Sequence, residues 1–130
     1  MQYSNAVGKP RVVLIHHTHW DREWYYAFEK FRYRLANCLD DVLRLLEDPR
    51  FHSFTLDGQV APLDDYLELR PENAEKAKQA VRRGRLLIGP WYVQPDELLV
   101  DEESLVRNLL YGKQRAIEYG GWMPIGYLPD

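Results

Sequence analysis

Cysteine is almost absent from the sequence: Cys38 is the single one among 130 residues. An internal disulfide is therefore excluded, and a small thiol within a helical pattern indicates core packing for Cys38. The sequence also lacks an apolar run of membrane-spanning length, and residues 1–10 form a polar leader without the charged-then-apolar layout of a signal peptide. We expect a cytoplasmic protein with no membrane partner.

An excess of one charge is also missing, because the formal net charge is only -3 and both signs are interspersed. Without a basic patch, nucleic acid is not expected as a partner. What the sequence does contain is 45% hydrophobic and 28% charged residues, the balance of one folded domain. Four Trp and nine Tyr supply flat rings that suit the apolar faces of sugars, although most buried aromatic residues belong to the core.

Short apolar runs alternate with segments of helical periodicity. The runs predict strands at residues 12–15, 51–56, 85–88 and 123–128, the first of them buried on both faces. The periodic segments predict helices from about residue 29 to Pro49 and at 63–69, 72–83 and 104–119. Ser104 is the expected cap of the last helix, and Gly120 and Gly121 its end. The alternation predicts an α/β fold with a parallel sheet.

Residues able to do chemistry follow these strands. They are the segment 17–24, Asp57, the segment 91–97 and Asp130. Right-handed crossovers place the carboxyl ends of parallel strands at one edge of the sheet, where functional groups gather. We therefore expect these four parts of the chain to open onto the same rim.

His19 and Asp21 are the candidate metal ligands. Alternate residues of an extended segment point the same way, so both side chains can reach one ion. Imidazole and carboxylate suit zinc and its neighbours, and Asp130 is the best candidate for a third ligand. The alternative is a loop whose residues only cap and pack, but clustered ligand-type residues at a strand end favour a site.

The remaining histidines are less clearly assigned. His16 and His17 either orient the ligands by hydrogen bonding or, for His16, end the buried strand. His52 is expected to be structural.

Four further residues carry open alternatives. Trp24 is expected to stack on a sugar slightly more than to pack in the core, and Trp91 is evenly balanced between these roles. For Asp96 with its neighbour Glu97, a solvated turn is favoured over contact with the site. Asp57 precedes Gly58 and is expected to be a turn residue rather than a catalyst.

The string His-Thr-His-Trp-Asp-Arg-Glu-Trp-Tyr at residues 17–25 closely resembles the first signature of the glycoside hydrolase family 38 α-mannosidases, in its bacterial form. Three later segments, 56–59, 89–97 and 126–130, resemble the following segments of that family in the same order. The resemblance implies the first part of a (β/α)7 barrel-like catalytic domain, incomplete, over residues 11–130.

By that resemblance, His19 and Asp21 match two metal ligands, Trp24 an aromatic that lies against mannose, and Asp130 the nucleophile, which also contacts the metal. The implied reaction is retaining hydrolysis of terminal α-mannosidic bonds with one divalent ion, zinc being favoured. Trp20, Arg22 and Glu23 depart from the Asn, Pro and Gly of animal members, which favours bacterial specificities.

The sequence stops before the family's acid/base carboxylate and its remaining histidine ligand. We therefore expect an enzyme as the intact parent, compatible with a homo-oligomer, and little or no activity from this chain alone. The expected substrate is a mannose-containing oligosaccharide or a small mannoside, mannosylglycerate being the close alternative. A non-catalytic fragment that binds sugar or metal is the alternative of another class, and a metal-dependent deacetylase is a third that lacks its further histidine pair here.

Overall fold

The computed structural model describes residues 10–129. Nine of the ten leader residues and the candidate nucleophile Asp130 therefore lie outside the described residues. Between residues 10 and 129 the chain forms four α-helices, one short 3-10 helix and two short parallel strands. This confirms the α/β class, while a closed barrel goes beyond what these elements form.

The first helix, α1, spans Phe28–Leu45 and presents one apolar face to the core. Leu35, Leu39 and Val42 recur at helical spacing on that face and are buried, as the sequence predicts. The helix ends before Pro49, whose ring cannot continue an α-helix.

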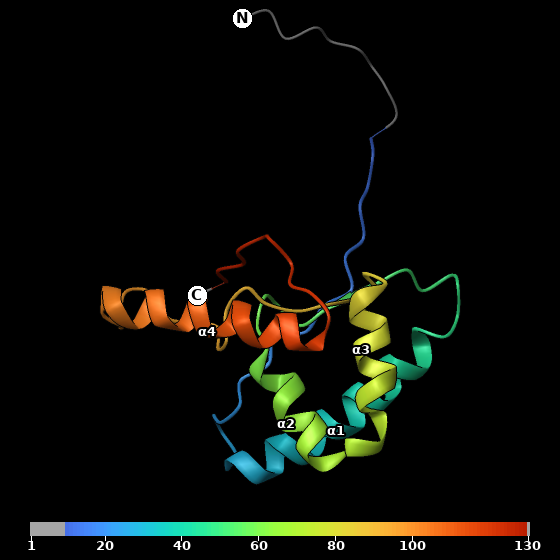
Figure 1. The fold of residues 1–130 in the computed structure, drawn as a ribbon, viewed down its shortest axis with the longest axis horizontal. Helices are drawn as coiled ribbons and strands as arrows, with labels where there is room; N and C mark the ends of the chain where they lie inside the picture. The colour runs from blue at the N-terminus through green and yellow to red at the C-terminus, as the bar shows by residue number, and fades with distance from the viewer. Residues whose placement is uncertain (1–9, 130) are drawn as a thin grey trace, which may run out of the picture.

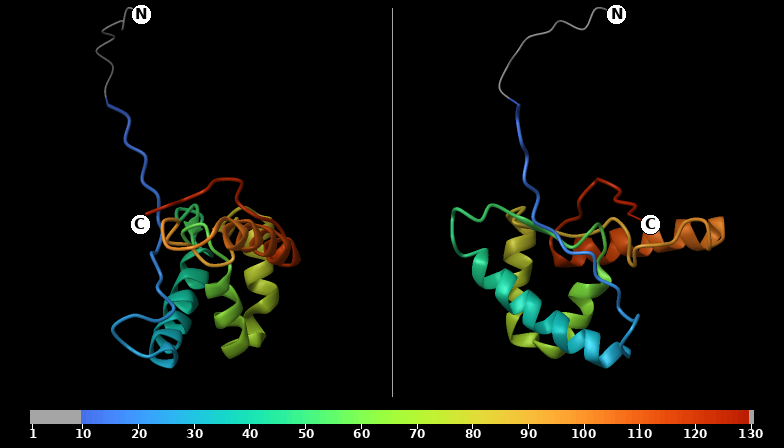
Figure 2. Two further views of the ribbon diagram at one scale, coloured as in Figure 1. Left: turned by 90° about the vertical axis from the view of Figure 1, so that its left-hand side faces the viewer. Right: turned by 180° about the vertical axis from the view of Figure 1, so that it is seen from behind.

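Three further helices complete the helical layer. These are α2 (Ala61–Leu69), α3 (Ala74–Arg82) and α4 (Glu102–Tyr119), with the 3-10 turn η1 (Pro71–Asn73) between α2 and α3. α1, α2 and α3 lie together on one side, and α4 runs across their end (Figures 1 and 2). The cap of α4 differs from the expectation: Asp101 accepts a hydrogen bond from the Ser104 backbone N–H at 2.8 Å. Aspartate one turn earlier is the better cap because its carboxylate accepts both this N–H and the Ser104 hydroxyl.

The sheet consists of β1 (Phe54–Thr55) and β2 (Leu86–Leu87), which pair in parallel with Phe54 opposite Leu86. Both lie inside the segments predicted as strands. They belong to a core that joins the two strands to all four helices. Its most buried large side chains are Leu35, Leu39, Leu56, Leu63, Tyr66, Leu86 and Ile88.

The predicted strand at 12–15 is wrong for the described chain. Val12, Val13, Leu14 and Ile15 are between 66% and 88% exposed, and the segment extends away from the helices (Figures 1 and 2). Its apolar composition is that of a strand buried on both faces, but residues 10–129 place no layer of side chains over it. Pairing begins only at its end, where His17 forms an isolated parallel bridge with Thr55.

The predicted strand at 123–128 is also wrong for the described chain. The Met123 backbone N–H donates to the Ile88 carbonyl at 2.8 Å, but residues 124–128 continue without strand structure. Pro124 and Gly126 interrupt this run, since proline has no N–H for a ladder and glycine weakens a strand interior.

Candidate metal and sugar site at the strand ends

The segment that carries the histidines is fixed to the end of β1. Thr55 donates its N–H to the His16 carbonyl at 3.0 Å and accepts from the Thr18 N–H at 3.3 Å. These bonds set His17 beside Thr55, so its ring reaches Asp57, two residues further along. The predicted gathering of the 17–24 segment and Asp57 at one rim is thus confirmed.

Asp57 is a buried carboxylate at the centre of this rim. It is 1% exposed, and its φ of 49° lies in the left-handed region that aspartate tolerates better than most residues. One carboxylate oxygen, Oδ1, is 2.6 Å from His17 Nδ1, and the other, Oδ2, is 3.8 Å from His19 Nδ1. Burial raises the pKa of Asp57, and the hydrogen bond to His17 opposes that rise. The residue is therefore more than a turn former, because it faces two imidazoles.

His19 and Asp21 lie close together, as the sequence predicts. His19 Nε2 is 3.4 Å from Asp21 Oδ1, and both side chains are accessible from solvent. Two ligands of a tetrahedral zinc ion with bonds of about 2.0–2.1 Å are separated by about 3.3 Å, so this spacing fits one ion. The nitrogen on the other side of the ring, Nδ1, faces Asp57. Such an arrangement, with one ring nitrogen toward a carboxylate and the other toward a ligand position, is typical of metal-binding histidines.

Two glutamines join the three segments of the rim. Gln59, 2% exposed, donates from Nε2 to the Trp20 carbonyl at 3.2 Å and accepts from the Gln94 N–H at 3.3 Å. Gln94 in turn donates from Nε2 to the Asp57 carbonyl at 2.8 Å. Neither glutamine was predicted from the sequence; the signal available was their position beside Asp57 and in the loop before Asp96.

A cavity of about 260 Å³ opens between these segments. His19 and Asp21 line it from one side, and Gln94 and Asp96 from the other. Asp96 is exposed and so can meet a solute as well as solvent. The cavity is large enough for one sugar ring and collects both candidate ligands.

The two candidate sugar-stacking tryptophans differ in their surroundings. Trp24 is 73% exposed, with only an edge contact to the Tyr25 ring, so it does not pack in the core of the described chain. Trp91 is partly buried, and its indole Nε1 is buried without a hydrogen-bond partner among the described residues. Its backbone forms an isolated parallel bridge with Gln59, which continues the parallel pairing past the ends of β1 and β2.

The remaining histidines also have defined places. His16 is exposed and lies against the Phe51 ring, with centroids 4.5 Å apart, so it is not the last buried residue of a strand. His52 is exposed as well.

The described residues supply part of a metal site only. Within residues 10–129 no group of three His, Cys, Asp or Glu side chains is arranged to hold an ion. The donor set of His19 and Asp21 fits a divalent ion in type and spacing, and the third candidate, Asp130, lies outside the described residues.

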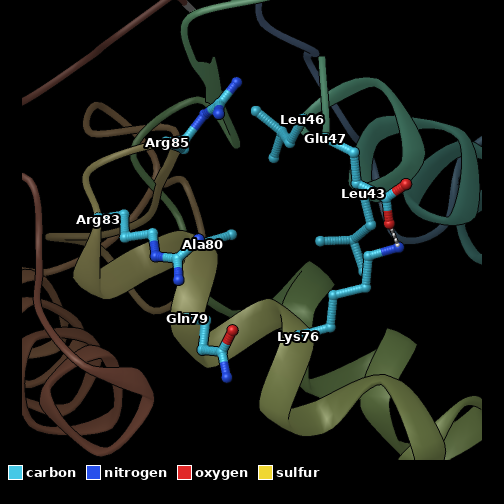
Figure 3. Close-up of a pocket in the computed structure, with 8 residues that line it drawn as sticks. All are labelled: Leu43, Leu46, Glu47, Lys76, Gln79, Ala80, Arg83 and Arg85. Carbon is cyan, nitrogen blue, oxygen red and sulfur yellow. Dashed lines mark ion pairs between the residues drawn. The ribbon is translucent and has the colours of Figure 1, made fainter. Parts of the chain in front are cut away.

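A second pocket, of about 370 Å³, lies between α1 and α3, away from these residues (Figure 3). Its lysine, Lys76, is paired with Glu47 across the opening at 2.5 Å. Arg85, also in its wall, donates to the Asp48 and Phe51 carbonyls and so ties the chain after α1 to β2. These bonds indicate that the residues around this pocket hold the helical layer together.

No helix among the described residues has the length and apolar character needed to span a membrane.

The parallel strands, with candidate ligands and an exposed tryptophan at their carboxyl ends, define an α/β domain of the kind that binds ligands at a sheet edge. The family model "Glycosyl hydrolases family 38 N-terminal domain" matches residues 9–130. The chain therefore belongs to glycoside hydrolase family 38, which confirms the resemblance found in the sequence.

Two relatives carry names that denote different activities. A protein of Halalkalibacterium halodurans named "Putative mannosylglycerate hydrolase" is 48% identical over 119 residues, which cover 90% of this chain and 13% of the relative. "Alpha-mannosidase G" of Dictyostelium discoideum is 32% identical over 130 residues, covering 97% of this chain and 12% of the relative.

A solved structure agrees with this family assignment. The crystal structure of an alpha-mannosidase from Enterococcus faecalis V583 matches with a TM-score of 0.86 and 49% identity, over 89% of this chain and 13% of that one. This chain thus spans only a small part of the length of the relatives it matches.

Proposed function

We propose that the whole protein is a metal-dependent glycosidase that cleaves terminal α-mannosidic bonds, and that this chain is the first part of its (β/α)7 barrel-like catalytic domain. The observation that carries the proposal is the pairing of His19 Nε2 and Asp21 Oδ1 at 3.4 Å beside a sugar-sized cavity, in a chain of this family. A divalent ion held there, zinc by the chemistry of the donors, supplies positive charge that orients the sugar hydroxyls.

The residues of the chain then divide the work. His19 and Asp21 hold the ion, and His17 with Asp57 keeps the segment at the strand end. Trp24 offers its exposed ring to the mannose. Asp96 lines the cavity, and Trp91 borders the rim through its backbone bridge to Gln59.

Asp130 is the proposed nucleophile and a further ligand. Its carboxylate attacks the anomeric carbon while a second carboxylic acid, from beyond this chain, protonates the leaving oxygen. The sugar is then bound to Asp130 as an ester, and water, losing a proton to the same second group, displaces the Asp130 carboxylate. Two inversions at the anomeric carbon retain its configuration. In retaining enzymes the two carboxyl groups are about 5 Å apart.

A second candidate function within the same class is hydrolysis of a small mannoside such as mannosylglycerate. The 48% identity to the H. halodurans protein of that name favours it. The two functions share the ion, the nucleophile and the tryptophan, and differ only in the group that leaves.

The test uses the whole protein on an aryl α-mannoside and on mannosylglycerate, before and after removal of metal by a chelator. We expect activity on at least one substrate, its loss with the chelator, and its recovery on adding zinc. Asp130→Asn should lower kcat by about a thousandfold or more, since the covalent step is lost. Activity that ignores both the chelator and Asp130→Asn would rule out the proposal.

The alternative of a non-catalytic piece that binds metal by itself is tested on the 130-residue chain. With only part of the ligand set present, zinc should bind weakly in a calorimetric titration. Tight stoichiometric binding by this chain would instead favour a self-contained metal-binding piece.

A further inference from the structure

An ion pair ties the segment with the candidate ligands to helix α2. Arg22 Nε donates to Asp65 Oδ2 at 2.7 Å, and Arg22 Nη2 donates to Asp65 Oδ1 at 2.8 Å. Two parallel bonds fix the plane of the guanidinium against the carboxylate, which a single bond does not. Arg22 directly follows Asp21 and precedes Trp24 by one intervening residue. The pair therefore holds the chain between a candidate ligand and a candidate sugar-stacking ring.

The surroundings of the pair strengthen it. Asp65 is only 6% exposed, so water competes weakly for its oxygens. The Arg22 guanidinium also lies 5.1 Å from the centroid of the Phe28 ring, at the start of α1.

A second tether lies on the other side of Asp21. The Trp20 carbonyl accepts from Gln59 Nε2 at 3.2 Å. Asp21 thus sits between two anchored neighbours, one held by an amide from the β1 loop and the other by a carboxylate from α2.

We infer that Arg22 and Asp65 form a positioning pair that presents Asp21 and Trp24 together to the ion and the sugar. The inference rests on the proposed function, which supplies the ion and the sugar. Arg22 also lines the cavity of about 260 Å³, but its Nε and Nη2 are both bonded to Asp65, so we assign the pair a positioning role through the segment it holds. Loss of the pair should loosen the segment and weaken both zinc and substrate binding.

The chain offers a matched control one residue away on α2. Asp64 pairs with Arg115 of α4, Nε to Oδ1, at 2.9 Å. The arginine side chains of the two pairs are equally exposed, 35% for Arg22 and 34% for Arg115. Among residues 10–129 the Arg115 pair joins α2 to α4 and makes no hydrogen bond with residues 17–24. Arg115 also bonds Glu118 and Tyr119, so its loss disturbs the fold at least as much as the loss of one partly buried ion pair.

The experiment compares Arg22→Ala, Arg22→Lys and Arg115→Ala in the whole protein. Arg22→Ala should weaken zinc binding, measured against a competing chelator, by about tenfold and raise KM for an aryl α-mannoside by about as much. Arg115→Ala should leave both within about twofold, whatever it does to Tm. Arg22→Lys should restore only part of the loss, because an ammonium is a point charge without the planar fork that makes two parallel bonds to a carboxylate. Equal changes in zinc affinity and KM for Arg22→Ala and Arg115→Ala would overturn the inference.

Hydrogen exchange of the amides of residues 20–24 tests the pair without using activity. Exchange should speed up in Arg22→Ala and stay unchanged in Arg115→Ala. Unchanged exchange in Arg22→Ala would overturn the inference even in an active enzyme. Absence of zinc binding and mannoside cleavage in the unaltered protein would instead contradict the proposed function, and faster exchange in Arg22→Ala would still support the tether.

Discussion

At the scale of single residues, exposure separates side chains that serve the fold from those that serve a ligand. Trp24 has 73% of its surface free, although tryptophan is costly to leave in water. Cys38, in contrast, is partly buried on α1, outside the segments that form the rim.

Trp24→Ala should therefore affect the substrate and leave the fold intact. Removal of an exposed ring changes the free energy of unfolding by no more than about 0.5 kcal/mol, so Tm should stay nearly constant. Loss of a ring that stacks on mannose should raise KM of the whole protein by about tenfold. Trp24→Phe serves as the control that keeps a flat apolar face, and equal KM values for the alanine variant and the unaltered protein would contradict the role.

The thiol of Cys38 should react slowly. Burial raises its pKa, and the nearby Asp41 carboxylate acts in the same direction. A raised pKa lowers the thiolate fraction at neutral pH, so alkylation by iodoacetamide at pH 7.5 should be at least about tenfold slower in the folded chain than in urea. The folded-state rate should climb with pH past the ordinary range of a cysteine, and a plateau near pH 8 would show that the thiol is not shielded.

At the scale of elements, α4 depends on one position without a side chain. A Cβ placed on Gly112 would overlap the backbone of Pro90, Trp91 and Tyr92, which packs directly against the helix. Asn108, one turn earlier, holds the same loop by accepting the Tyr92 and Val93 N–H groups at 3.0 Å. The packing of α4 against this loop therefore fixes the position of the segment that continues to Asp96.

Gly112→Ala should destabilise the chain by about 2 kcal/mol or more, because backbone cannot move aside as a flexible side chain can. Thermal unfolding measures the loss. Gly126→Ala is the matched control, since nothing lies within 4 Å of its Cβ position. Comparable Tm values for the two variants would mean that the close approach of α4 to the loop does not matter for stability.

Elements set by local periodicity could be predicted from the sequence. The stripe of Leu35, Leu39 and Val42 fixes α1, and short runs rich in apolar residues mark the places of β1 and β2. Residues 12–15 show where local reasoning fails, because burial depends on which other elements cover a segment and composition does not contain that information.

The candidate site was predicted in outline, since the parallel sheet brings the strand ends together. His19 and Asp21 meet at one cavity as expected, and Asp96 lines it as well, although a solvated turn was favoured for that residue. Asp57 faces His19 and so has a larger role than a turn residue. Gln59 and Gln94 were missed because amide side chains have no spacing signature; their partners are backbone groups that only the folded chain assembles. The nucleophile assignment of Asp130 stays a prediction.

At the scale of the whole molecule, one face is markedly apolar. A pocket of about 540 Å³ is lined by Val13, Ile15, Ile125 and Tyr127, all of them substantially exposed. Contiguous apolar surface of this kind binds hydrophobic dyes and promotes association.

The 130-residue chain should accordingly bind the dye ANS in its folded state. Replacing Val13 and Ile15 with aspartate should reduce that fluorescence, with a change in unfolding free energy of no more than about 0.5 kcal/mol because both side chains are already in solvent. Leu39→Ala, at a position 1% exposed, is the contrasting variant and should cost about 3 kcal/mol. A large loss of stability from the aspartate pair would show that residues 12–15 are packed.

The histidine segment pairs with β1 through the bridge from His17 to Thr55, and β1 pairs with β2, a pairing that the bridge from Gln59 to Trp91 continues. These neighbours in space are also neighbours in sequence. Each new strand therefore docks on one that has already left the ribosome, and no earlier strand must wait for a distant partner. The rim can form stepwise during synthesis, with the histidine segment meeting Asp57 before the loop that carries Gln94 and Asp96 has been translated.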